Sequence, residues 1–171
     1  ISISPSMAYI ERAYDQAKYG QFSERPYIDM VIPSMIDRDM APPGHHVMSC
    51  FVQYAPYDVE GGWTDAKKAA FGETVISTIE QYAPNIRRAI VGKQVITPKD
   101  IERIAGITGG NILHGELLLH QLFFMRPAPQ WADFRTPLSG YYFGAAGAHP
   151  GGGVMGAAGK MAATEILKDW Q

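Results

Sequence analysis

The stretch "AHPGGGVMGAAGKMAATEIL" (Ala148 to Leu167) decides what is expected at the C-terminal end of the chain. Three consecutive glycines, Gly151 to Gly153, precede an alanine-rich segment that predicts a helix from near Gly153 to about Lys168. Glycine loses more conformational freedom on folding than other residues, so it is favoured where a side chain would obstruct a close approach. The first N–H groups of a helix lack internal partners and favour an anion or an electron-rich carbonyl.

Small residues also predict close packing by this helix. Gly156, Gly159 and Ala163 are three and four residues apart, so one helix face carries almost no side chain. On spacing alone, a tight turn followed by a close helix contact explains the glycines as well as a ligand does. The segment is not a dinucleotide fingerprint, because no G-x-G-x-x-G follows the first strand of a βαβ unit.

The rest of the chain predicts an α+β fold, because strands are followed by helices without regular βαβ alternation. An N-terminal helix is expected with Ser4 as its cap, Pro5 in its first turn and Gly20 after its end. Strands are expected over 26–33, 45–57 and 139–147, the last running into a glycine turn. Further helices are expected over 64–83, capped by Thr64, and over 97–106, capped by Thr97.

Composition restricts the classes of function. The chain has 171 residues and a net charge of -2, which argues against a surface for nucleic acid. Its one cysteine, Cys50, excludes an intrachain disulfide and is expected to be buried. The apolar run over 112–124 is too short for a membrane span and contains two histidines and a glutamate. The chain begins "ISISPSMAY" without methionine or a signal peptide, so we expect a fragment or a processed chain located in the cytoplasm.

A family resemblance is carried by "TPLSGYYFGAAGAHPGGGVMGAAGKMAATEIL" (Thr136 to Leu167). This segment resembles the C-terminal end of the phytoene desaturase-like flavoproteins, within the amine-oxidase-type FAD superfamily. The nearest branch is similar to the mitochondrial pyridine nucleotide-disulphide oxidoreductase domain-containing proteins and their bacterial relatives. The resemblance extends upstream through "APPGHHVMSCFVQYAPY", "ITPKDIERIAGITGGNILHGEL" and "LFFMRPAP", which occupy 41–57, 96–117 and 122–129.

The resemblance implies a C-terminal strand–turn–helix that closes over FAD, with the start of the helix facing the flavin pyrimidine carbonyl. The residues that would line the isoalloxazine ring are Gly151, Gly152, Gly153 and Val154. Those expected near the ribityl chain and pyrophosphate are Gly144, Ala145 and Ala146, although relatives commonly have glycine in place of Ala145. His149 is expected either at the flavin edge or in a purely structural turn.

The dinucleotide-binding unit that the family carries at its N-terminus has no counterpart in these residues. The resemblance therefore implies a portion of an antiparallel substrate-domain sheet with helices over 1–135, and the FAD-closing segment over 136–171. Such a site for FAD is incomplete, and we expect the separate chain to bind FAD weakly or not at all. A mitochondrial location follows from the resemblance if the chain is eukaryotic, and peripheral contact with a membrane is expected from the lipid substrates of relatives.

Other polar residues have two interpretations each. His114 is expected near the substrate, where it would relay protons, or in the packed interior with a satisfied hydrogen bond. Arg126 and Arg135 would steer an anionic ligand or lie solvated on the surface, and the second is favoured. His45 and His46 are adjacent on a predicted strand and would face opposite sides, so no metal site is predicted.

Two functional hypotheses remain open. In the first, the chain is the C-terminal part of an FAD-dependent desaturase or dehydrogenase that acts on an apolar small molecule. No catalytic side chain is assigned in this hypothesis. In the second, the chain is a non-catalytic interaction or scaffold module derived from such a flavoprotein. An apolar face left exposed would then favour a homo-oligomer.

Overall fold

The computed structural model describes residues 1–170, and the chain divides into two compact units, Ile1–Ile101 and Glu102–Gln171. A three-stranded antiparallel sheet combined with helices confirms the predicted α+β class. The boundary between these two units separates two compactly folded parts of the chain. The predicted boundary between residues 135 and 136 separates a substrate-domain portion from an FAD-closing segment, and it stays a prediction.

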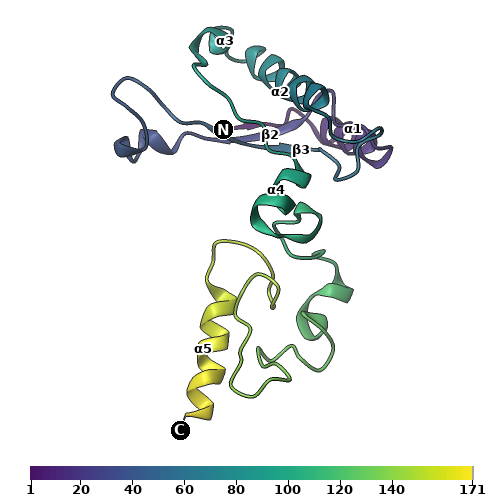
Figure 1. The fold of residues 1–171 in the computed structure, drawn as a ribbon, viewed down its shortest axis with the longest axis vertical. Coiled ribbons are helices and arrows are strands. Elements are labelled where there is room, and N and C mark those ends of the chain that lie inside the picture. The colour runs from purple at the N-terminus through teal and green to yellow at the C-terminus, as the bar shows by residue number, and fades with distance from the viewer. Residues whose placement is uncertain (171) are drawn as a thin grey trace. The chain divides into compact units, whose positions relative to one another are not determined.

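The elements are shown in Figure 1. The strands are β1 (Ser2–Ile3), β2 (Tyr27–Val31) and β3 (Ser49–Gln53). The helices are α1 (Met7–Lys18), α2 (Asp65–Glu80), α3 (Ile86–Ala89), α4 (Pro98–Ala105) and α5 (Ala157–Asp169). Short 3₁₀ turns lie at Pro33–Met35, Arg38–Met40, Thr108–Gly110, Leu119–Gln121 and Phe123–Met125.

The first unit is built on the sheet, whose strand order is β1-β2-β3. In β2 the side chains of Ile28 and Met30 are buried while their neighbours are half-buried or exposed, which is the alternation of a strand with one covered face. Met30 pairs with Cys50 of β3, whose thiol is half-buried. Helix α2 lies over this face (Figure 1), and its Ile79 joins Ile3 and the two β2 residues in one apolar core.

Helix caps explain where the helices of this unit begin. Thr64 caps α2 as predicted, because its hydroxyl accepts a hydrogen bond from Lys67 N–H at 3.2 Å. The predicted cap of α1 is wrong by two residues. Ser6 caps that helix instead of Ser4, accepting from Tyr9 N–H at 3.2 Å.

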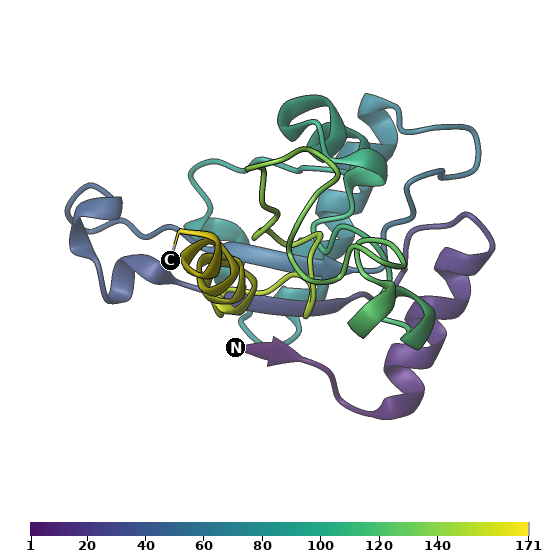
Figure 2. The same cartoon turned by 90° about the horizontal axis from the view of Figure 1, so that it is seen from below.

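The strand predicted over 45–57 is longer than the observed β3. The last pair of the β2–β3 ladder is Val31 with Ser49, and Pro33 then turns the chain out of the sheet. Residues 45–48 therefore have no strand partner among the described residues and belong to the loop. The whole connection between the two strands extends away from the sheet, as Figure 1 and Figure 2 both show.

The second unit is largely irregular, and two predictions fail in it. The strand predicted over 139–147 is reduced to one isolated bridge between Arg135 and Tyr142, because no described strand of this unit lies beside it. Helix α5 begins at Ala157 and not near Gly153. The backbone φ angles of Gly151 and Gly153 are +106° and +146°, which a right-handed helix excludes.

Close packing by α5 is observed and involves Gly159 as predicted, with Ala158 and Ala162 in place of Gly156 and Ala163. Gly144 lies against the helix where Ala158, Gly159 and Ala162 face it. Gly156 is the residue before the first turn, and Ala163 is exposed. The core of this unit is completed by a small set of buried side chains: Phe134, Ala148, Ala158 and Ala162, with Phe143 packed against them.

None of the helices in residues 1–170 has the length and apolar character needed to cross a membrane.

Candidate functional site

The glycine segment, residues 151–153, lies in a loop that precedes α5. Gly151 is buried, Gly152 is half-buried, and Gly153 is exposed together with Val154. A Cβ atom added at Gly151 would lie 2.9 Å from Leu117 Cδ2, and one at Gly152 would lie 3.1 Å from Leu113 Cα. The first two glycines therefore serve close packing within the unit, and the third borders solvent.

The start of α5 lies a few residues beyond this segment. Its N-cap residue is Gly156, in the left-handed conformation at φ +65°, and no side chain of the described residues caps the helix. The positive end of the helix dipole therefore belongs to the N–H groups that follow Gly156, and not to the glycine segment.

Arg126 connects the glycine segment to the apolar run over 112–124. Its side chain is 3% exposed, which contradicts the prediction of a solvated surface arginine. Nη2 donates to the carbonyl oxygens of Leu113 at 2.7 Å, His114 at 3.2 Å and Ala146 at 2.8 Å. Nη1 donates to the carbonyl oxygens of Glu116 and Gln121, both at 3.3 Å. One guanidinium thus provides hydrogen-bond donors for backbone carbonyl groups that no helix or sheet satisfies in these loops.

His149 makes defined contacts inside this unit. Its Nδ1 accepts a hydrogen bond from Phe123 N–H at 3.1 Å, and the two rings lie 5.0 Å apart. This bond requires an unprotonated Nδ1, so the neutral ring carries its proton on Nε2. The contact suits the predicted structural role, and the predicted role at a flavin edge stays open for Nε2.

The other predicted residues fall in the same loops. His114 is exposed, has a φ angle of +55°, and joins Ala146 through the shared guanidinium. Ala145 is exposed, and Gly144 is packed against α5. The structure therefore links the His114 backbone to Ala146 through a buried arginine that sequence patterns did not reveal. The predicted role of the His114 side chain near a substrate stays a prediction.

Apolar side chains remain exposed around the glycine segment. Leu113 and Leu117 contact Gly152 and Gly151 yet are more than one third exposed. The same run and the turn before α5 expose further large apolar side chains: Ile112, Leu118, Leu119, Phe123, Phe124, Val154 and Met155. An exposed apolar surface of this kind indicates contact with an apolar ligand or with another protein surface.

Arg135, also expected on the surface, is half-buried in an ion network with α5. It pairs with Glu165 at 3.1 Å and with Asp169, which also accepts a hydrogen bond from the Tyr142 hydroxyl. Donation by Arg135, reinforced by Tyr142, lowers the pKa of Asp169. Lys168, followed by Arg135, lowers the pKa of Glu165. These charges attach α5 to the loop before it, so Arg135 has a structural role.

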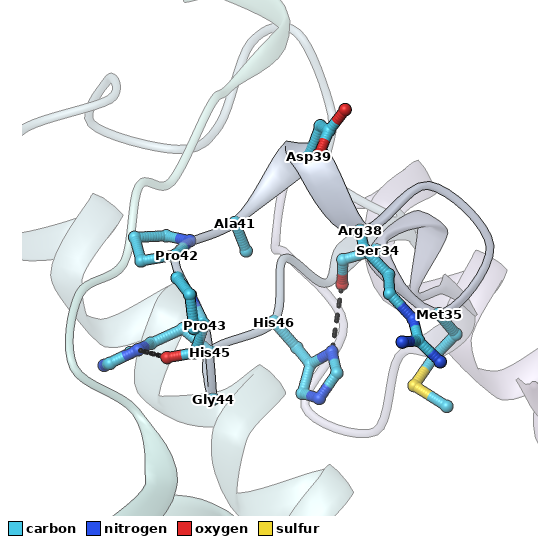
Figure 3. A pocket seen from close by; sticks show the side chains of 10 residues that line it. All are labelled: Ser34, Met35, Arg38, Asp39, Ala41, Pro42, Pro43, Gly44, His45 and His46. Carbon is cyan, nitrogen blue, oxygen red and sulfur yellow. Dashed lines mark hydrogen bonds between the residues drawn. The ribbon is translucent and has the colours of Figure 1, made fainter.

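A separate hollow of about 660 Å³ lies in the β2–β3 connection of the first unit (Figure 3). Ser34 Oγ lies 3.2 Å from His46 Nδ1 and accepts a hydrogen bond from Val47 N–H at 3.0 Å. His45 Nδ1 lies 3.3 Å from the carbonyl oxygen of Pro43, so the two imidazoles have different partners. The strand predicted to separate them is absent here, and within residues 1–170 no three potential metal ligands cluster.

The chain is similar in sequence to known proteins. No family model matches the chain. The pyridine nucleotide-disulfide oxidoreductase domain-containing protein 2 of Rattus norvegicus is 48% identical over 162 residues, covering 94% of this chain and 28% of the relative. The resemblance predicted from the glycine segment is confirmed.

Relatives of lower identity are named as a dehydrogenase and a desaturase, the two kinds of enzyme that the resemblance implied. A 4,4'-diapolycopen-4-al dehydrogenase of Metabacillus indicus is 32% identical over 85% of this chain and 29% of its own length. A phytoene desaturase (lycopene-forming) of a Paracoccus strain is 26% identical over 77% of this chain and 26% of its own length. The chain thus spans less than one third of the relatives it matches.

The burial of Arg126 was not predicted from the sequence. This arginine stands between "LFFM" and "PAP", with no acidic residue among its near neighbours in sequence. A lone arginine in an apolar stretch is a signal for burial against carbonyl groups. The carbonyl partners, up to 20 residues away, could not be predicted from the pattern.

Proposed function

We propose that this chain is part of an FAD-dependent oxidoreductase that acts on an apolar small molecule. The observation that carries the proposal is the similarity, over 94% of this chain and 28% of the relative, to a protein named for an oxidoreductase domain. The exposed end of the glycine segment, at Gly153 and Val154, supports it because a planar ring can approach the backbone there.

The residues present fit a flavin at this place. Gly153 and Val154 would line the ring, as the resemblance implies, and the uncapped start of α5 lies just beyond them. The N–H groups that follow Gly156 would orient an electron-rich carbonyl and stabilise negative charge on it. When bound, FAD supplies the capacity to accept a hydride or its equivalent from a C–H or C–N bond.

The apolar surface supports an apolar substrate. Leu113 and Leu117 flank the glycine segment and present exposed side chains beside it. They would exclude water and orient a hydrocarbon without hydrogen bonds. His114 would lie near that substrate, with Nδ1 or Nε2 able to move a proton. An apolar substrate of this kind would also favour peripheral contact of the whole protein with a membrane.

The first experiment is a visible absorption spectrum. The 171-residue chain is measured after FAD is added and the excess removed, and the longest natural protein containing it is measured as purified. We expect little retained flavin in the chain and a flavin spectrum in the longer protein. A longer protein that is folded and free of flavin, even after incubation with FAD, would overturn the proposal.

A substitution locates the flavin. Val154→Glu places a negative charge at a fully exposed position of the glycine segment, so it would repel the electron-rich flavin edge without disturbing the core. Val91→Glu makes the same change at an exposed position of the first unit. We expect the first variant alone to weaken flavin retention, by about tenfold for an interaction of about 1.4 kcal/mol. Equal retention in both variants would exclude this position for the ring.

The second candidate is a non-catalytic scaffold that binds another protein. It is favoured by the contacts that Gly151 and Gly152 make with Leu117 and Leu113, since these need glycine even without a flavin. In this case the exposed apolar surface would bind protein, including a second copy of the chain. Size-exclusion chromatography with light scattering separates the two, because a monomer over a wide concentration range counts against self-association.

A further inference from the structure

A cavity of about 430 Å³ lies in the second unit, with Arg126 in its wall. Its lining is divided in character. The apolar part consists of Met125, Pro127, Pro129 and Phe143, and the polar part consists of His114, His120, Gln121 and Arg126, with Gly147 beside them. A cavity of this size holds a small organic molecule.

The polar part carries a positive charge without a matching negative one. Arg126 is 3% exposed, and within residues 1–170 its guanidinium has carbonyl oxygens as its hydrogen-bond partners and no carboxylate. Its Nε–H, which lies toward Gly151, is buried and has no hydrogen-bond acceptor in the described part of the chain. A buried cation is normally paired, because its desolvation is otherwise not compensated.

The other polar side chains of the wall do not offset the positive charge of Arg126. His114 and His120 add two imidazoles to the same wall, each able to donate a hydrogen bond. The carboxylate of Glu116 lies 3.8 Å from His120 Nε2, and Glu116 is not part of the lining. The cavity therefore combines an apolar wall with a region of positive potential.

We propose that this cavity binds an organic carboxylate. The carboxylate accepts hydrogen bonds from the two histidines, and the apolar body lies along Pro127, Pro129 and Phe143. Arg126 attracts the carboxylate through its charge, because its Nη groups already donate to carbonyl oxygens. The occupant compensates the charge of Arg126 and at the same time covers the apolar wall. His114 belongs both to this cavity and to the substrate side of the proposed flavin site. Binding here requires no flavin, so a failure of this proposal is distinguishable from a failure of the proposed function.

The test uses the complete 171-residue chain at pH 7, with benzoate as the probe and benzyl alcohol as its neutral counterpart. Calorimetry measures affinity, and the imidazole NMR signals of His114 and His120 report the location. We expect benzoate to bind about tenfold or more tightly than benzyl alcohol, as expected for a charge-assisted interaction. Inorganic phosphate is expected to bind more weakly than benzoate, because it leaves the apolar wall uncovered.

Two variants at one exposed lining position keep the test independent of folding. Pro129→Glu adds a negative charge to the cavity wall, and Pro129→Gln is its neutral match. We expect the glutamate variant to weaken benzoate binding about fivefold or more relative to the glutamine variant, through like-charge repulsion. Arg126→Gln also removes the carbonyl contacts, so it is not the deciding variant.

Three results would overturn the proposal. They are equal binding of benzoate and benzyl alcohol, binding of phosphate at least as tight as benzoate, and equal benzoate affinity in the two Pro129 variants. Absence of any binding by the folded chain would overturn it as well.

Discussion

At Gly144 the main chain passes so close to α5 that a methyl group does not fit without movement. An added Cβ would lie 2.9 Å from Ala162 Cβ and 3.3 Å from Gly159 Cα. Gly144→Ala is expected to destabilise the second unit by about 1–3 kcal/mol, the usual range for overpacking. Thermal or urea unfolding measures the change. Gly92→Ala is the control, because nothing lies within 4 Å of its added Cβ, and it should be close to neutral.

Arg126 makes a second residue-scale prediction. Arg126→Gln removes donors to five backbone carbonyl oxygens and is expected to cost about 2–3 kcal/mol, as for hydrogen bonds to a charged group. Arg126→Lys should recover only part of this, because one ammonium cannot reach all the carbonyls. Limited proteolysis within 112–124 is the measurement. Cleavage as slow as in the unmodified chain would show that the guanidinium does not hold these loops.

Helix α5 provides a prediction on pH. Arg135 helps to lower the pKa of Asp169 and of Glu165, so both carboxylates bind fewer protons in the folded state than in the unfolded state. Their contribution to stability is fully present above the unfolded pKa of a carboxyl group and is lost as the pH falls through the lowered folded pKa. Acid should therefore weaken the attachment of α5.

The variant Arg135→Gln tests this linkage. At neutral pH it should be less stable than the unmodified chain, and the difference should shrink as both carboxylates become protonated. Unfolding followed by circular dichroism across an acid series measures it. A difference that is the same at every pH would assign the role of Arg135 to packing and not to charge.

At the scale of elements, the sequence predicted the position of a helix or strand well where caps and neighbouring residues determine it. The Thr64 cap placed α2 to within a few residues, and the strand predicted over 26–33 contains the observed β2. The start of α5 was predicted too early, because glycine at Gly151 and Gly153 adopts positive φ angles that composition does not reveal. Strand 139–147 was predicted from apolar residues, but a strand needs a partner that lies elsewhere in the chain.

The candidate site was predictable only in its outline. The motif singled out the segment over 144–154, and the resemblance added His114 as a residue on the substrate side. The guanidinium that joins them depends on carbonyl groups of Leu113, Glu116 and Ala146, which are far apart from Arg126 in sequence, and no spacing rule specifies such a contact. The same reason explains why burial of Arg126 was missed.

Across the whole molecule, the two units differ in how their backbone is hydrogen-bonded. The first has a sheet and a helix packed on a core of Ile3, Ile28, Met30 and Ile79. The second has mostly loops around alanines and two phenylalanines. Hydrogen exchange should be slowest in β2 and α2 and fast over 112–124, because exposed loops open locally at low cost. Strong protection over 112–124 would indicate a partner or ligand covering that surface.

Cys50 has a practical consequence as a built-in reporter of sheet opening. It is the single thiol of the chain, it is half-buried in β3 opposite Met30, and burial raises its pKa. The reactive thiolate is therefore scarce while the sheet is closed, and alkylating reagents will act mainly on molecules whose sheet has opened. Because each chain carries a single thiol, the rate of alkylation measures how often the sheet of the first unit opens, and it does so without a signal from the second unit.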